Sequence, residues 1–151
     1  MSTRATVRGD APCAAGTLRR ASRSLARLYD THLGKAGLTT TQFSILRTVQ
    51  RRGGRTPLAE LAADLVFERT SLYRALAPVR RAGLVAICDG ADRRARYVAL
   101  TPKGERRVAA AMPHWIEAQR AVLDRFGVGA WHALASQLRD LTALARAVHR
   151  P

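Results

Sequence analysis

The sequence predicts a mainly α-helical fold with six helices and one small β-hairpin, in which a helix-turn-helix is followed by the hairpin as a wing. Two short apolar runs, 84–88 and 97–101, flank a loop that contains three arginines, which is typical of a hairpin with a cationic tip. A compact helical segment that ends in Arg81-Ala82-Gly83 comes directly before this hairpin. The chain has 151 residues, a length that suits a single domain with its own core.

The first predicted helix runs from about Cys13 to about Leu33 and follows a stretch, residues 1–12, that we expect to be a mobile tail. Positions three to four residues apart give this helix one mostly apolar face, formed by Leu18, Ser22, Leu25, Tyr29 and His32. Its opposite face carries several arginines. Gly34 and Gly37 end the helix.

The second predicted helix has a capping box, with Thr39 as the N-cap and Gln42 three residues later. Leu38 and Phe43 are spaced for the hydrophobic staple that accompanies such a cap. Phe43 then begins a buried stripe that continues with Leu46 and Val49. Gly53-Gly54 ends the helix.

The third and fourth predicted helices form the helix-turn-helix. Thr56-Pro57 is expected to open the third, with a capping hydroxyl and a proline at the first helical position. The fourth runs from about Glu68 to Ala82, and Gly83 stops it. Pro78 lies inside it and should bend it locally. The inward faces are expected to be Leu58, Leu61, Ala62 and Leu65, then Leu72, Leu76 and Val79.

In the hairpin, Val85 and Ile87 are expected to point one way, with Tyr97 and Ala99 paired across from them. Thr101-Pro102 then opens a fifth helix that reaches about Phe126, with a kink at Pro113. A sixth helix carries an apolar stripe with alternating spacings of three and four, a period suited to packing on another helix, at Trp131, Leu134, Leu138, Leu141 and Ala145.

The charge of the chain favours nucleic acid as the partner. The formal net charge is +15, from 26 basic and 11 acidic residues. Only Lys35 and Lys103 are lysines, and the guanidinium of arginine matches phosphate oxygens and guanine edges with two hydrogen bonds. An Ala- and Arg-rich genome would explain arginine in place of lysine, but it would not explain the excess of positive charge.

Other classes of protein are not supported. No apolar run exceeds five residues and the first twelve residues do not resemble a secretory signal, so we expect no membrane association. Two cysteines without metal-ligand spacing point to the cytoplasm. The sequence contains no Gly-rich phosphate loop, no Gly-x-Ser-x-Gly and no His/Cys cluster, so we expect no enzyme, no metal and no cofactor.

The expected DNA-binding residues lie at two places. If the apolar face of the fourth helix turns inward, its first turns leave polar side chains exposed for a major groove: Arg69, Thr70, Ser71, Tyr73 and Arg74. Arginines at the hairpin tip are placed to enter a minor groove, with an aspartate to hold one of them extended: Asp92, Arg93, Arg94 and Arg96. The alternatives are an ordinary solvated helix face and a charged turn that protects an edge strand.

From the second helix through Thr101 the sequence resembles the MarR-type family of bacterial winged-helix transcription regulators. The matching pieces keep their order and spacing over more than sixty residues, and they are residues 38–43, Arg69-Thr70-Ser71-Leu72 with Arg74, residues 81–85, residues 92–96 with 98–101, and Gly104. The first, fifth and sixth helices fit the dimerisation elements of that family in place and length. The resemblance to the family is therefore most specific within residues 38–101.

This resemblance implies a homodimer that binds a pseudo-palindromic double-stranded operator, usually as a repressor, and that leaves DNA when a small aromatic or phenolic ligand acts on it. Residues 38–101 would be the DNA-binding lobe, and residues 13–37 and 102–151 would carry the dimerisation helices. Arg69, Thr70, Ser71 and Arg74 take the groove-reading role, and Arg94 the wing-tip role with Asp92 as its partner. The ligand cleft of the family lies between these parts, where its lining would be Tyr29, His32, Phe43, Met112 and Trp115.

Two alternatives remain open beside this hypothesis. The oxidant-sensing branch of the family uses a cysteine near the start of the first helix, a place that Cys13 approaches, with Tyr29 nearby. A thiol-based repressor is therefore one alternative, although Cys13 lies about two residues early and Thr40 stands where a second tyrosine is expected. The other is an architectural protein that coats DNA without sequence preference, which the high positive charge would allow.

Overall fold

A computed structural model describes residues 12–90 and 95–148 of the chain. The mainly helical fold with six α-helices is confirmed, and its elements are α1 (Ala14–Leu33), a short 3-10 turn η1 (Gly34–Ala36), α2 (Thr40–Arg51), β1 (Arg55–Pro57), α3 (Leu58–Leu65), α4 (Arg69–Arg81), β2 (Val85–Asp89), β3 (Arg96–Leu100), α5 (Pro102–Phe126) and α6 (Val128–Val148).

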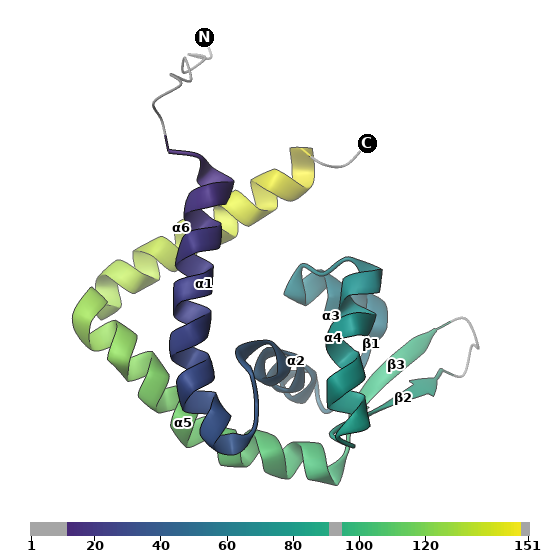
Figure 1. Cartoon of the computed structure of the whole chain (residues 1–151). Helices are drawn as coiled ribbons and strands as arrows, with labels where there is room; N and C mark the ends of the chain where they lie inside the picture. The colour runs from purple at the N-terminus through teal and green to yellow at the C-terminus, as the bar shows by residue number, and fades with distance from the viewer. Residues whose placement is uncertain (1–11, 91–94, 149–151) are drawn as a thin grey trace.

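The helices divide into an outer frame and an inner lobe (Figure 1). The long helices α1, α5 and α6 form the frame, and α2, α3, α4 and the sheet form the lobe. In this view α5 runs along the bottom and then turns upward, as expected of a helix with an internal proline, Pro113. α4 also contains a proline, Pro78, and is one continuous helix through it, so the local bend expected there stays a prediction. The hairpin projects from the lobe on the side away from the frame.

Local signals in the sequence explain where several helices begin. The Cys13 side chain caps α1 by accepting a hydrogen bond from the amide of Gly16. The capping box of α2 is confirmed, because Thr39 Oγ1 accepts from the Gln42 amide at 3.2 Å and Gln42 Oε1 accepts from the Thr39 amide at 3.0 Å. Thr101 caps α5 by its side chain alone, which accepts a hydrogen bond from the amide of Gly104 at 3.0 Å.

The expected cap at Thr56 is wrong. Thr56 lies in β1, a third strand that the sequence analysis did not predict, and α3 begins at Leu58 without a side-chain cap. β1 pairs antiparallel with β3, with Thr56 opposite Val98. The Thr56 side chain is therefore turned into the core, where its hydroxyl is buried and lacks a hydrogen-bond partner in the described part of the chain.

The sheet has the order β1-β3-β2, and the hairpin register differs from the prediction by one residue. Val85 lies opposite Leu100 and Ile87 opposite Val98, so Tyr97 and Ala99 pair instead with Cys88 and Ala86. The reason is burial, since Val98 is completely buried and must share the inner face with Val85.

The core lies inside the lobe and against one side of the frame. The predicted inner faces of α2 and α4 are confirmed, with Phe43, Leu46, Val49, Leu72, Leu76 and Val79 all buried. In the frame, burial is much poorer. Within the described structure α1 buries only Leu33, and α6 buries no residue at all. The apolar stripes of these two helices are therefore left largely uncovered in a single chain.

Candidate nucleic-acid interface

α4 presents its polar residues to solvent because its apolar residues are fixed in the core. Leu72, Leu76 and Val79 are about 1% exposed and lock the rotation of the helix. The opposite side of the first turns then leaves Arg69, Thr70, Ser71 and Arg74 exposed, with Tyr73 half-buried. The free amides at the start of a helix carry a partial positive charge, so this end favours an anion such as a phosphate.

The wing is described only at its base. Its strands are closed by a hydrogen bond from the amide of Gly90 to the carbonyl of Ala95 at 2.7 Å. Arg96 is exposed, with its Nε 3.7 Å from a carboxylate oxygen of Asp89. The predicted tip residues Asp92, Arg93 and Arg94 lie outside the described residues. The proposed partnership of Asp92 with Arg94 therefore stays a prediction.

The structure brings the start of α4 and the base of the wing to one surface. A hollow of about 430 Å³ lies between them and the N-terminal part of α3. Arg69, Leu72 and Tyr73 line it from α4, and Ala95 and Arg96 from the wing. Two residues predicted as major-groove contacts thus lie across a shared hollow from one predicted as a wing contact.

A further arginine on the sheet was missed by the sequence analysis. The guanidinium of Arg55 in β1 lies over the ring of Tyr97 in β3, 4.4 Å from the ring centroid. A cation held over an aromatic face is partly ordered before it meets any partner. Because the contact depends on β1 pairing with β3, no local signal in the sequence could have revealed it.

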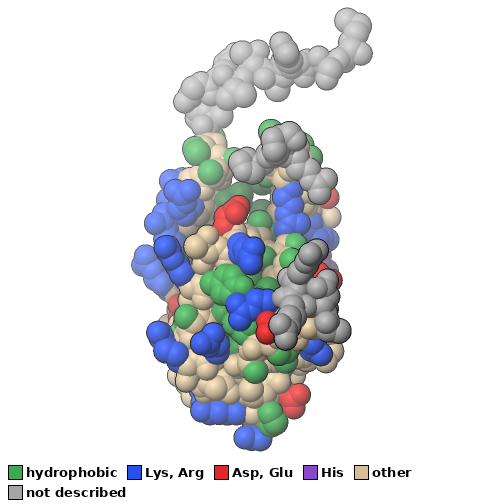
Figure 2. All heavy atoms as spheres, turned by 90° about the vertical axis from the view of Figure 1, so that its right-hand side faces the viewer, with side chains coloured by type: hydrophobic (Ala, Val, Ile, Leu, Met, Phe, Trp, Pro, Cys, Tyr) green, Lys and Arg blue, Asp and Glu red, His purple; other side chains and the backbone are tan. Residues whose placement is uncertain are grey.

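Basic side chains are spread widely over the side of the molecule that carries α4 and the wing. Figure 2 shows Lys and Arg side chains around a central apolar patch on this face, with few acidic side chains among them. With a net charge of +15, such a surface attracts a polyanion at long range.

The five residues predicted to line a ligand cleft lie at the junction of α1, α2 and α5. The rings of Phe43 and Trp115 are stacked with their centroids 6.4 Å apart, and Met112 packs against the same core. The Tyr29 hydroxyl donates to Oε1 of Gln119, and burial raises the pKa of Tyr29.

His32 belongs to a polar group on the outside of this junction. Its Nδ1 lies 3.4 Å from Oε2 of Glu117, which also accepts a hydrogen bond from Lys35 at 3.2 Å. The bonds from Lys35 and then His32 lower the pKa of the Glu117 carboxyl.

A groove of about 1010 Å³, larger than the hollow between α4 and the wing, lies between α6, α3 and the start of α1. None of the five residues predicted to line a ligand cleft lines this groove.

The thiol of Cys13 is exposed at the start of α1, where it caps the helix, whereas Cys88 is half-buried in β2. The part of the chain that is described contains no helix long and apolar enough to cross a membrane. Within the same residues no three His, Cys, Asp or Glu side chains are grouped closely enough to hold a metal ion.

Comparison with known proteins identifies relatives of this chain. A family model described as a winged helix DNA-binding domain matches residues 38–104. The transcriptional regulator HosA of Escherichia coli O157:H7 is 34% identical over 104 residues, which are 64% of this chain and 76% of HosA.

Solved structures agree with this comparison. The transcriptional regulator MosR of M. tuberculosis, solved in complex with DNA, is 38% identical with a TM-score of 0.83, over 92% of this chain and 100% of that one. AbsC, a MarR family transcriptional regulator from Streptomyces coelicolor, is 22% identical with a TM-score of 0.79, over 93% of this chain and 97% of that one. Because AbsC is only 22% identical, its similarity to this chain shows a shared fold alone.

Proposed function

The chain belongs to the MarR family of winged-helix transcriptional regulators, and from this premise we propose that it is a homodimeric repressor that binds a pseudo-palindromic operator and is released by a small aromatic or phenolic ligand. The observation that carries the proposal is the shared hollow with Arg69 and Tyr73 on one side and Arg96 on the other. Two elements that could grip a duplex thus present cations on one surface. The DNA complex of the 38% identical MosR supports the same partner.

In this proposal residues 38–101 form the DNA-binding lobe, and α4 enters the major groove with its first turns. Arg69 and Arg74 are exposed and long enough to bond the O6 and N7 atoms of a guanine with both arms of the guanidinium. Thr70 and Ser71 are exposed beside them and suit phosphate or base-edge contacts. Tyr73 is half-buried and lines the hollow beside Arg69, and we propose it as a further DNA contact.

The wing would reach the adjacent minor groove. Arg94 takes the tip position in this proposal, held extended by Asp92, with Arg93 and Arg96 on the flanking phosphates. A narrow minor groove concentrates negative potential, which an inserted arginine exploits. Arg94→Ala should therefore weaken DNA binding and leave the melting temperature nearly unchanged, as measured by anisotropy and calorimetry, because an exposed loop arginine contributes little to folding. A large loss of stability would show that the arginine is packed against the protein.

The uncovered frame helices support dimerisation. α6 leaves Leu144 60% and Val148 78% exposed, and α1 leaves Leu18 38% exposed. Leu18 of α1 and Leu141 of α6 line one groove, and an exposed apolar patch shared by two helices marks an interaction site. Residues 13–37 and 102–151 are therefore proposed as the dimerisation segments. Deleting residues 128–151 should convert the dimer to a monomer in sedimentation velocity, and a truncated chain that still sediments as a dimer would contradict this.

The effector is proposed to act at the junction of α1, α2 and α5, where Tyr29, His32, Phe43, Met112 and Trp115 lie. Tyr29 and His32 are half-buried residues of α1 with polar groups, and Phe43 and Trp115 supply a stacked aromatic pair, a combination that suits a ligand with an aromatic ring and one hydroxyl or carboxylate. A thiol-based mechanism through the exposed Cys13 remains the alternative. Cys13→Ser would distinguish the two mechanisms, because it should abolish a response to an oxidant and leave a response to an aromatic ligand unchanged.

The test of the main proposal is a titration of fluorescent duplexes with the full-length protein. One duplex carries the region upstream of the protein's own gene and the other a scrambled sequence of the same composition. A regulator should prefer the upstream duplex, with half-site centres about 10 bp apart. Equal affinity for both duplexes would instead favour the architectural alternative. In that case salt alone should set the affinity, with log K falling by about 0.9 per log unit of salt concentration for each phosphate neutralised.

Two variants sharpen this test. Arg69→Ala should weaken binding to the upstream duplex by about 5- to 150-fold and relax the base preference at one position, as expected for a loss of about 1–3 kcal/mol. Arg106→Ala removes the same charge from an exposed position of α5 and is the matched control. If the two variants lose affinity equally on both duplexes, the groove-reading role of Arg69 is wrong.

A further inference from the structure

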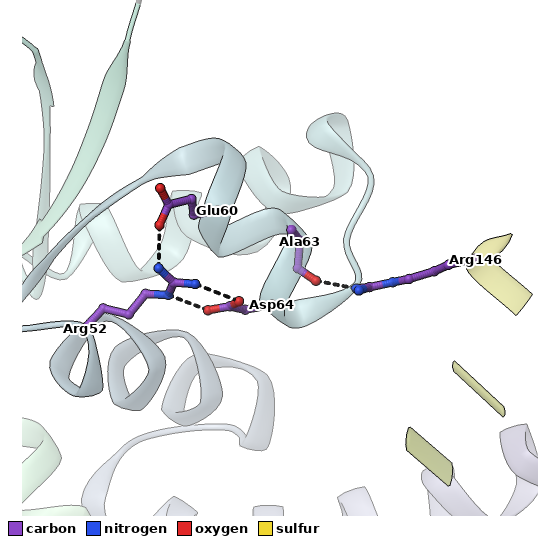
Figure 3. Close-up of polar contacts among 5 residues, drawn as sticks. All are labelled: Arg52, Glu60, Ala63, Asp64 and Arg146. Carbon is purple, nitrogen blue, oxygen red and sulfur yellow. Dashed lines mark hydrogen bonds and ion pairs between the residues drawn. The ribbon is translucent and has the colours of Figure 1, made fainter. Parts of the chain in front are cut away.

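The C-terminal end of α3 is a charged junction at which two arginines from different parts of the chain meet (Figure 3). The first is Arg52, at the end of α2. Its Nε and Nη2 donate to the Asp64 carboxylate at 2.5 and 2.9 Å, and its Nη1 donates to Glu60. This fork joins α2 to α3 inside the lobe.

The second arginine, Arg146, comes from the last turn of α6 in the frame. Its Nη2 donates to the carbonyl oxygen of Ala63, as Figure 3 shows. This carbonyl belongs to the last turn of α3, where the helix dipole leaves a partial negative charge that favours a cation. The bond from Arg52, with the added attraction of Arg52 and Arg146, also lowers the pKa of Asp64.

The junction stands next to the turn that leads into α4. The amide of Val66 also donates to the Ala63 carbonyl, at 3.3 Å. Val66 has a φ of 55°, a left-handed conformation that is unusual for a β-branched residue. The Ala63 carbonyl and the start of α4 are therefore only a few residues apart, and a hydrogen bond fixes the first part of the backbone that connects them.

Between α6 and α3 there is otherwise an open groove. Residues of α6 such as Leu138 and Leu141 face Ala62 and Val66 across it, and its volume is about 1010 Å³. Among residues 12–90 and 95–148, the bond from Arg146 is the only hydrogen bond or ion pair that joins α6 to residues 38–101. One side chain thus bridges a gap that packing does not close.

We propose that Arg146 is a positioning residue for DNA binding: it holds the lobe at a fixed orientation to α6 by tying the end of α3 to that helix, whereas α1 and α5 already share a core with the lobe. Its consequence for DNA rests on the proposed function. In a dimer each lobe is carried by its own frame, so the angle at this junction sets the distance between the two copies of α4. Half-sites lie about one helical turn apart, and a lobe that rocks on its frame matches that spacing less strictly.

The orientation can be measured without DNA. Spin labels are attached at Ala77→Cys on α4 and Gln137→Cys on α6, both exposed positions, in a chain with Cys13→Ser and Cys88→Ser. Labelled protein is diluted with unlabelled protein so that distances within one chain dominate. The unaltered junction should give one narrow distance distribution. Arg146→Ala should at least double the width of this distribution or add a second distance. Arg146→Lys, which keeps a cationic donor, should give a width between those of the parent and of Arg146→Ala.

The matched control is Arg139→Ala. Arg139 is exposed on α6 and lies two turns before Arg146, and both arginines line a neighbouring hollow of about 650 Å³ between α6 and the end of α3, but Arg139 has no hydrogen bond or ion pair to α3 in the described part of the chain. Its removal should leave the distribution unchanged. If Arg146→Ala and Arg139→Ala give the same narrow distribution, Arg146 does not position the lobe and the inference is overturned.

A second measurement connects the junction to DNA. The upstream duplex is compared with one that has a single base pair inserted between the half-sites. The unaltered protein should lose at least tenfold in affinity on the inserted duplex, whereas Arg146→Ala should lose less than about threefold, with circular dichroism confirming the fold. An equal loss for both proteins overturns the effect on spacing. If the protein has no preference for the upstream duplex at all, the proposed function fails, and the distance measurement still decides the role of Arg146.

Discussion

The contact between α5 and the start of the wing leaves no room for a side chain at Gly104, and this predicts a large effect of one methyl group. Gly104 is buried in the first turn of α5. A Cβ added there would lie 2.0 Å from the carbonyl oxygen of Leu84 and 3.1 Å from Cδ2 of Leu100. The Leu84 oxygen also accepts the amide of Thr101 at 3.1 Å, so it cannot turn away without breaking that bond.

Gly104→Ala should therefore destabilise the protein strongly. An ordinary contact to Cβ exceeds 3.4 Å, so α5 and β2 must separate by more than an ångström, and the neighbour is backbone rather than a flexible side chain. Overpacking of a core costs about 1–3 kcal/mol, and we expect at least the upper end of that range here. At about 2–4 °C per kcal/mol for a chain of this size, the melting temperature should fall by about 6–12 °C.

The assay is thermal unfolding followed by circular dichroism at one fixed protein concentration, because association would make the midpoint concentration-dependent. Gly34→Ala is the control. Gly34 lies at the end of α1 with a φ of −57°, and a Cβ there meets nothing within 4 Å. It should leave the midpoint unchanged or raise it slightly. A Gly104→Ala protein that melts with the parent would refute the close approach of α5 to Leu84.

Three further substitutions test other parts of the structure. Thr101→Val should cost about 1 kcal/mol in urea unfolding, since the hydroxyl caps α5 and also donates to the Gly83 carbonyl at 2.7 Å. Thr56→Val should be neutral or stabilising in the same assay, because it replaces a buried hydroxyl without a described partner by a methyl group, and a loss above about 1 kcal/mol would reveal a hidden hydrogen bond. The pKa of Asp64 is lower in the folded protein than its ordinary value of 3.8, which applies to the unfolded chain. Asp64 therefore stabilises the fold fully at pH values above 3.8, and this stabilisation is lost as the pH falls through the lower pKa of the folded state. The stability difference between the parent and Asp64→Asn should thus be constant near neutral pH and shrink below about pH 4, and a difference that grows on acidification would contradict the pairing with Arg52.

The sequence was most informative where one local signal decides the structure. The capping box at Thr39 and Gln42 predicts the start of α2, and the same reasoning holds for Thr101 at α5. The dipeptide Thr-Pro occurs at both 56–57 and 101–102, yet only the second caps a helix. The difference lies in residues far away: β3 offers an open edge, and Thr56 pairs with Val98 there. A three-residue strand that contains a proline has no pattern of its own to reveal it.

The same distinction holds for the candidate interface. The heptad-like spacing of Leu72, Leu76 and Val79 was enough to place Arg69 and Arg74 on the exposed side of α4. The stacking of Arg55 on Tyr97 and the bridge from Arg146 to α3 depend on elements that meet only in the folded chain. Periodicity determines which way a helix faces, but it carries no information about which distant side chain reaches it.

The folded chain also shows where its surplus of positive charge is left uncompensated. Some of the acidic side chains form local ion pairs: Glu60 and Asp64 pair with Arg52, and Glu117 pairs with Lys35. Among the described residues neither Arg69 nor Arg74 has a carboxylate within 4 Å. Since a paired cation contributes little field at a distance, Arg69 and Arg74 keep their full charge for a polyanion, whereas Arg96 at the base of the wing is partly compensated by Asp89. Net charge alone could not have shown which cations are paired, because a net charge of +15 is compatible with any arrangement of the pairs.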